Sequence, residues 1–93
     1  MEYTEYIVRI IGVRTDSAHL FYISNSLQDW ITDCRADAAV YDSIDAAKSA
    51  ISQGIGIIKR DLKACYRYEL AGVQIVKKIV LEDVIQTLNP PEF

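Results

Sequence analysis

The chain has 93 residues, 51% of them hydrophobic and 25% charged, with a formal net charge of −3 at pH 7. This length suits one domain with a modest core, and self-association would bury further apolar surface. No run approaches the roughly 18 consecutive apolar residues of a membrane span, and Glu2 and Glu5 stand where a secretion signal would be basic and then apolar. We therefore expect a cytoplasmic protein.

Two segments near the N-terminus are predicted to pair as a hairpin. Residues 6–13 are β-branched and aromatic and are followed by turn-forming residues, and residues 19–24 form the returning strand. Both faces of the first strand are largely apolar, whereas a single helix covers only one face of a sheet. We therefore expect the second face, which carries Ile7, Ile11 and Val13, to bind a partner, with a homodimer as the first candidate.

Residues 25–41 are ambiguous between helix and extended structure. Leu27, Trp30, Ile31 and Cys34 have helical spacing behind Ser26, but residues 30–32 are also good strand formers. We expect an irregular or single-turn segment, followed by a short third strand over residues 38–41.

The longest helical pattern runs from Asp42 to Lys63. Its apolar residues recur at steps of three and four and form one stripe: Ile44, Ala47, Ile51, Ile55, Ile58 and Leu62. Asp42 and Ser43 are both suitable N-caps. Gly54 and Gly56 weaken a helix interior, so Gly54 is a possible end, but we expect a continuous helix in which Gly54 permits close approach to the sheet.

Residues 64–70 and 73–81 are predicted to form a second hairpin around Ala71 and Gly72. With this turn, most apolar residues of the two strands lie opposite each other on one face, and most polar residues lie on the other. Residues 82–88 suit a closing helical turn or a frayed extension, and residues 89–93 suit a flexible tail. The predicted fold is one α+β domain over residues 1–88. It has an antiparallel sheet of four to five short strands, with the long helix packed on one face and two to three strands before it.

Part of this pattern resembles small phage and prophage proteins of unknown function. The likeness rests on the first hairpin, Trp30-Ile31-Thr32-Asp33, Ala39 to Ser43, and Ala46-Ala47. It covers roughly residues 6–47, and Ile31 interrupts the pattern by separating Trp30 from Thr32. The resemblance implies a fold and offers no functional residues.

Charge is unevenly distributed along the chain. Residues 1–45 carry eight acids and three bases, and residues 46–93 carry seven bases and five acids. The acidic cluster is typical of a solvated face, and the alternative is a partner-binding surface at Asp29, Asp33 and Asp37. The bases of the second half likewise favour a solvated helix face, and the alternative is a nucleic-acid surface with nearby tyrosines, formed by Lys59, Arg60, Lys63, Arg67, Lys77 and Lys78.

Catalytic signals are weak. His19 is the only histidine, which excludes a multi-histidine metal site, and no nucleophile motif accompanies it. Cys34 and Cys65 lack CxxC spacing, and Gly54-Ile-Gly56 lacks the context of a phosphate loop. We expect no enzyme, metal or cofactor. The leading hypothesis is a phage-type protein–protein interaction module that binds another protein, and a sharper version is an inhibitor of a host defence nuclease.

Overall fold

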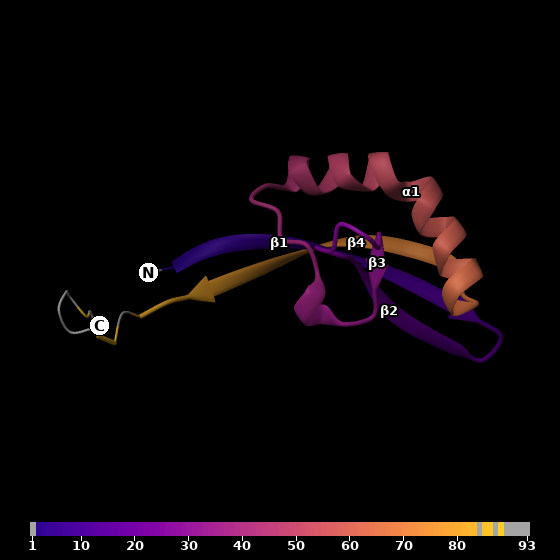
Figure 1. The fold of residues 1–93 in the computed structure, drawn as a ribbon, viewed down its shortest axis with the longest axis horizontal. Helices are drawn as coiled ribbons and strands as arrows, with labels where there is room; N and C mark the ends of the chain where they lie inside the picture. The colour runs from indigo at the N-terminus through magenta and orange to yellow at the C-terminus, as the bar shows by residue number, and fades with distance from the viewer. Residues whose placement is uncertain (1, 84, 87, 89–93) are drawn as a thin grey trace.

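A computed structural model has a four-stranded antiparallel sheet with one long helix on one face, which confirms the predicted α+β class (Figure 1). It describes residues 2–83, 85, 86 and 88. In chain order the elements are β1 (Glu2–Arg14), β2 (Ser17–Ile23), β3 (Ile31–Thr32), the 3-10 helix η1 (Arg35–Asp37), α1 (Ile44–Tyr66) and β4 (Glu69–Leu81). Their order across the sheet is β3-β2-β1-β4.

Strand β1 lies in the middle of the sheet and extends beyond β2 and β3. From Arg9 to Val13 it pairs with β2 on one side and with β4 on the other. Towards the N-terminus it pairs with β4 as far as Glu2, and among the described residues its other edge is met only by a bridge from Tyr6 to Tyr41. Residues 2–5 and 78–81 therefore form a two-stranded ribbon, the β1–β4 arm, which projects from the body of the molecule (Figure 1).

The main core lies between the sheet and α1. Val8 and Ile10 of β1 meet Ile58 and Leu62 of α1, and all four side chains are fully buried. Burying a large aliphatic side chain contributes about 2 kcal/mol, so this row holds the helix on the sheet. Within the predicted stripe Ala47 is also buried, Ile51 and Ile55 are half-buried, and Ile44 at the first turn is exposed.

Helix α1 is continuous through both glycines, as predicted, and extends three residues beyond Lys63. Ser43 is the N-cap, and its Oγ accepts a hydrogen bond from the Ala46 N–H at 3.0 Å. At the other end Arg67 has φ 66° in the left-handed region, and the Arg67 and Tyr68 N–H groups donate to the carbonyls of Lys63 and Leu62. This pattern satisfies the last carbonyls and turns the chain into β4.

Gly54 permits a close contact between α1 and the Trp30 indole. Gly54 is buried, and a Cβ at this position would lie 2.6 Å from Cε3 of Trp30 and closer still to Cζ3. Gly56 has no neighbour within 4 Å of the equivalent point. The close approach predicted at Gly54 was to the sheet, whereas the neighbour is Trp30, a side chain of the β2–α1 connection.

The predicted second hairpin is wrong. Residues 69–81 form one uninterrupted strand, β4, which pairs with β1 throughout. The register shifts where Ile11 pairs with Gly72 and Gly12 pairs with Leu70, so Ala71 is an extra residue in a β-bulge. A bulge reverses the alternation of side chains just as a turn would, so Leu70 and Val73 both face the helix. The alternation in the sequence is compatible with either feature.

Residues 25–41 are mostly irregular, as expected, but the short strand comes first. Strand β3 pairs with β2 through Thr32 and Ile31, and η1 follows it. The predicted strand over residues 38–41 is reduced to two isolated bridges, Ser24 to Ala38 and Tyr6 to Tyr41. This segment passes to the side of the sheet opposite α1 (Figure 1). There Ala38 packs with Ile7 and Tyr22 in a second small core.

In the C-terminal stretch, the described residues between 82 and 88 lie in neither a helix nor a strand. The predicted tail over residues 89–93 lies outside the described residues. No helix in the described part of the chain is long and apolar enough to cross a membrane.

The two helix glycines provide a matched pair of substitutions. We expect Gly54→Ala to lower the free energy of unfolding by about 2 kcal/mol, because the new methyl group overlaps the Trp30 ring. We expect Gly56→Ala to raise it by about 1 kcal/mol, because alanine favours the helix and the position is open. Urea unfolding of both variants measures the difference, and equal effects would contradict the Trp30 contact.

Candidate functional site

Three clefts that share lining residues lie along α1 beside the β2–α1 connection and the end of the sheet. Their volumes are about 390, 210 and 310 Å³. Asp29 and Trp30 line both the first and the second cleft, and Cys65 and Tyr66 line both the second and the third. We call the three clefts together the α1 groove.

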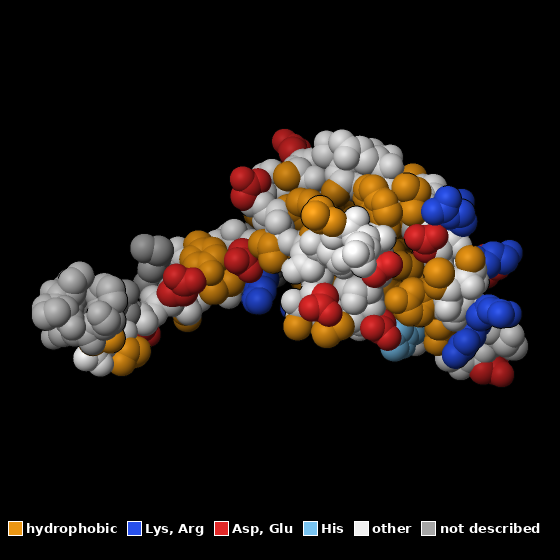
Figure 2. Space-filling view, viewed as in Figure 1, with side chains coloured by type: hydrophobic (Ala, Val, Ile, Leu, Met, Phe, Trp, Pro, Cys, Tyr) orange, Lys and Arg blue, Asp and Glu red, His pale blue; other side chains and the backbone are white. Residues whose placement is uncertain are grey.

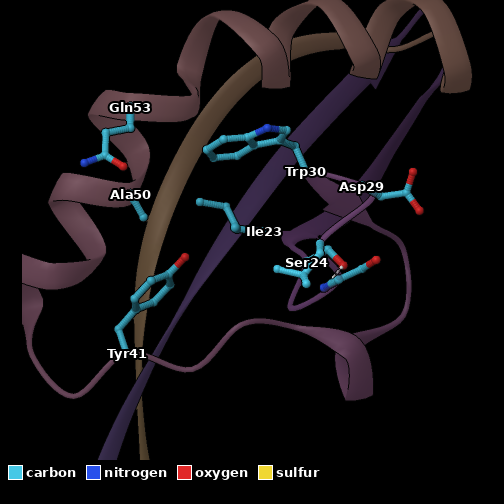
Figure 3. A pocket seen from close by; sticks show the side chains of 9 residues that line it. Ile23, Ser24, Asp29, Trp30, Tyr41, Ala50 and Gln53 are labelled. Atoms are coloured by element: carbon cyan, nitrogen blue, oxygen red, sulfur yellow. Dashed lines mark hydrogen bonds between the residues drawn. The ribbon is translucent and has the colours of Figure 1, made fainter.

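The first cleft is walled by two aromatic side chains. Figure 3 shows Trp30 lying beneath α1 near Gln53, with Tyr41 and Ala50 on the far side of the opening. Desolvation by burial raises the pKa of Tyr41 above its ordinary value. Aromatic walls of this kind provide large apolar contact area and faces that attract cations.

The loop at the mouth of this cleft is shaped by serine side chains. Ser24 Oγ accepts from the Ser26 N–H at 3.0 Å, and Ser26 Oγ accepts from the Gln28 N–H at 3.1 Å. The Ser24 N–H donates to the Trp30 carbonyl at 2.9 Å, which closes the loop. Serine hydroxyls that accept a hydrogen bond from the backbone N–H two residues ahead stabilise tight turns. The loop therefore holds Asp29 and Trp30 together at the edge of the groove.

The second and third clefts gather carboxylates around Tyr66. Asp29 and Asp61 line the second cleft, and Asp33 lines the third. The pKa of Tyr66 is raised, first by desolvation and then by the negative charges of Asp33, Cys65 and Asp29. Figure 2 shows acidic side chains interspersed with hydrophobic ones on this face. The α1 groove thus combines an aromatic floor with an acidic rim.

Of the three predicted acidic site residues, two lie in the α1 groove. Asp29 and Asp33 line it, whereas Asp37 belongs to η1, where its carbonyl accepts from the Asn25 N–H. Asp61 and the aromatic floor were not predicted from the sequence. Helical spacing from Cys65 could have indicated Asp61, because residues four apart share a helix face. The contribution of Trp30 depends on its contact with Gly54, which is remote in sequence.

The predicted apolar site residues lie on the sheet face opposite α1, and the first of them is covered. Ile7 is only 4% exposed, because Tyr22 and Ala38 pack over it. Ile11 and Val13 are half-buried, and Leu20, paired with Ile11, is 42% exposed. The chain therefore covers part of this face itself and leaves the part nearest the β1–β2 turn accessible.

The predicted basic residues do not form one patch. Lys59, Arg60, Lys63 and Arg67 are exposed near the C-terminal end of α1, where Arg60 pairs with Asp61 and Lys63 with Glu69. Lys77 and Lys78 lie at the base of the β1–β4 arm, about 30 Å away at ordinary strand rise. Arg14, which was not predicted, places its guanidinium 4.3 Å from the Tyr68 ring centroid at the end nearer Arg67.

His19 shares the third cleft with Cys65 and Asp33. Its ring packs edge-on against Phe21 at 4.8 Å, within a cluster of aromatic side chains that includes Tyr68. Among the described residues no group of three or more His, Cys, Asp or Glu side chains could hold a metal ion. The geometry around His19 is that of a packed aromatic cluster.

Neither family models, nor curated proteins, nor solved structures gave a match to this chain. Function is therefore inferred from the chain's own residues.

The charge around Tyr66 can be tested directly. We expect Asp33→Asn to lower the pKa of Tyr66 towards its ordinary value, because removing a nearby negative charge makes the phenolate less unfavourable. Asp37→Asn is the matched control and should leave this pKa unchanged. Titration followed by NMR of labelled tyrosine rings measures both, and an unchanged Tyr66 in Asp33→Asn would contradict the acidic rim.

Proposed function

We propose that this chain is a non-enzymatic protein–protein interaction module whose α1 groove binds a basic segment of another protein. The observation that carries the proposal is the combination of Asp29, Asp33 and Asp61 with the aromatic side chains of Trp30 and Tyr66 in one groove.

Charge and shape both favour a cationic occupant. Lysine and arginine carry an aliphatic stem and a charged head, so they can pack on an aromatic wall while their charge meets a carboxylate. The 390 Å³ cleft beside Trp30 could hold one such side chain, with Asp29 at its edge. The second and third clefts could hold further residues of the same segment.

A sharper form of this proposal is an inhibitor of a nuclease, as expected for a phage-type protein directed at host defence. A nuclease presents a basic groove to the phosphate backbone, and an acidic surface can compete for that groove. Asp29 and Asp33 would supply the competing charge from the rim of the α1 groove. Asp37 lies off the groove and is expected to contribute less.

The binding test uses the single tryptophan of the chain, Trp30, as its reporter. An arginine octapeptide should change the Trp30 fluorescence on binding, since Trp30 lines the groove. In Asp29→Asn/Asp33→Asn we expect binding roughly three- to tenfold weaker, because each exposed charge pair contributes at most about 1 kcal/mol. Added salt should weaken wild-type binding in the same direction.

Asp37→Asn is the control, because it removes the same charge outside the groove. It should bind the octapeptide within about twofold of wild type. Equal weakening by Asp37→Asn would show attraction by net charge alone and would contradict a groove-specific site. Absence of any fluorescence change at low salt would also count against the proposal.

A nucleic-acid-binding accessory protein is the second candidate, and the Arg14–Tyr68 contact favours it. A base stacking beside Tyr68 would lie near exposed cations at the C-terminal end of α1. Figure 2 shows Lys and Arg side chains gathered at the end of the molecule away from the β1–β4 arm. Lys77 and Lys78 would lie outside this surface.

Gel shifts with single-stranded DNA at low salt test this candidate. Arg67→Gly removes one of the cations and also relieves the left-handed backbone, so loss of binding would not reflect misfolding. Arg35→Gln removes one charge elsewhere and is the matched control. If the candidate is correct, only Arg67→Gly reduces the shift, and no shift with wild type would contradict it.

A further inference from the structure

We infer that the basic segment binds as an added β-strand on the open edge of β2, antiparallel to β2, with apolar residues beside Leu20 and a basic residue facing Asp33 in the third cleft. This mode of binding rests on the proposed function, because the occupant is the same basic segment of another protein. It adds how the backbone of that segment is held and which sequence pattern the segment has.

The outer edge of β2 is open over most of its length. Strand β2 runs from Ser17 to Ile23, and among the described residues β3 covers only its last two residues. After Thr32 the chain leaves the sheet and enters η1, so no strand of the described chain lies beside residues 17–21 (Figure 1). A strand from another protein can therefore continue the line of β3 along β2.

Two residues of this edge direct their backbone groups outward. Arg14 and Ser17 close a two-residue turn, which makes them a hydrogen-bonded pair, and such pairs alternate along antiparallel strands. The N–H and C=O groups of Ala18 and Leu20 therefore point away from β1, and no backbone group of the described chain meets them. In the same phase, the Ser24 N–H donates at 2.9 Å to the carbonyl that precedes β3. Such a row of free groups is what an added strand binds.

The β2 edge lacks the features that commonly protect a sheet edge. Charges, prolines and bulges all oppose the addition of a further strand. The opposite edge of the sheet has two of these features, because β4 contains Lys77, Lys78 and the bulge at Ala71. Residues 17–23 contain no lysine, arginine, aspartate, glutamate or proline, and their pairing with β1 has no bulge. Strand addition is therefore expected at β2.

The face of this edge away from α1 favours apolar residues. Leu20 lies on that face, paired with the half-buried Ile11, and is itself 42% exposed. Directly opposite residues of an antiparallel pair lie on the same face of the sheet. An apolar residue opposite Leu20 would therefore remove part of this side chain from water, and the position opposite Ala18 lies on the same face.

The helix-side face favours a basic residue. The position between those two, opposite His19, would face the third cleft, which Asp33 and Tyr66 line. Within the described part of the chain Asp33 has no ion pair, and Arg14, which also lines this cleft, lies over the Tyr68 ring. An added arginine or lysine could pair with the carboxylate while its stem packs on the aromatic side chain. The occupant is therefore an extended segment in which apolar and basic residues alternate.

A pair of N-methylated peptides tests the added strand. The probe is a capped hexapeptide in which valine and arginine alternate, and its binding to the ¹⁵N-labelled chain is measured by NMR. With valine beside Leu20, the valine N–H groups donate to β2 and the arginine N–H groups point away. N-methylation of every valine should therefore weaken binding at least about tenfold, and N-methylation of every arginine should leave it within about threefold. The two methylated peptides carry the same charge and the same number of methyl groups, so they control for each other.

Amide hydrogen exchange locates the added strand. At saturating unmethylated peptide, we expect exchange of the Ala18 and Leu20 N–H groups to slow at least about tenfold, because both become hydrogen-bonded. The N–H groups of Ser17 and His19 point towards β1 in either state, so they are internal controls that should change little.

A substitution in β2 tests the same contact from the other side. Ala18→Pro removes one outward N–H, and proline is tolerated where an edge N–H faces outward, so pairing with β1 should persist. We expect the unmethylated hexapeptide to bind this variant at least about threefold more weakly. Ala18→Ser keeps the N–H and is the matched control, with binding within about twofold of wild type. The NMR spectrum shows whether Ala18→Pro folds, and the methylated peptides decide without it.

Equal binding of the two methylated peptides, or unchanged exchange at Ala18 and Leu20 in the complex, would overturn strand addition. If the arginine octapeptide still binds and Asp29→Asn/Asp33→Asn weakens it, the proposed function stands without the added strand. Absence of binding by either peptide at low salt would overturn both. Weaker binding of the valine-methylated peptide alone, together with slowed exchange at Ala18 and Leu20, would support strand addition.

Discussion

The packing of the Trp30 indole on Gly54 is the contact on which the candidate site depends. It fastens the connection between β2 and α1 to the helix, although the two residues are 24 positions apart. The serine-stabilised turns from Ser24 to Gln28 then hold the loop that carries Asp29. A side chain at position 54 would displace the Trp30 indole. Because Trp30 lines two of the three clefts, the shape of both clefts would change.

A mismatch in strand length explains the other notable feature of the molecule. Strands β1 and β4 have 13 residues each, whereas β2 has seven and β3 two. The helix and the shorter strands can cover only the middle and one end of the long pair. The remaining end is the β1–β4 arm, which has hydrogen-bonding edges and apolar side chains but no core of its own.

Much of the fold could be predicted because it depends on local periodicity and capping. The stripe through Ala47, Ile58 and Leu62 indicates a helix with one buried face. Ser43 marks the start of this helix, because its Oγ accepts a hydrogen bond from the backbone N–H three residues ahead. The first hairpin follows from β-branched segments around a turn. From the sequence, the lack of a side chain at Gly54 indicated only that some group could lie close to the helix there. It did not indicate Trp30, because Trp30 lies in a loop that has no clear periodicity.

The sequence by itself determined the class of the fold, the position and phase of α1, and the two segments of the first hairpin, since hydrophobic spacing and capping act within a few residues. Tertiary structure alone decided that Ala71 is a bulge rather than a turn, because both features reverse the alternation and only pairing with β1 distinguishes them. It also decided that Ile7 is covered by Ala38, that Asp29 and Asp33 lie near Tyr66, and that Asp61 lines the same cleft as Tyr66. Such groupings join residues far apart in the chain, and no local pattern in the sequence specifies which distant segments meet.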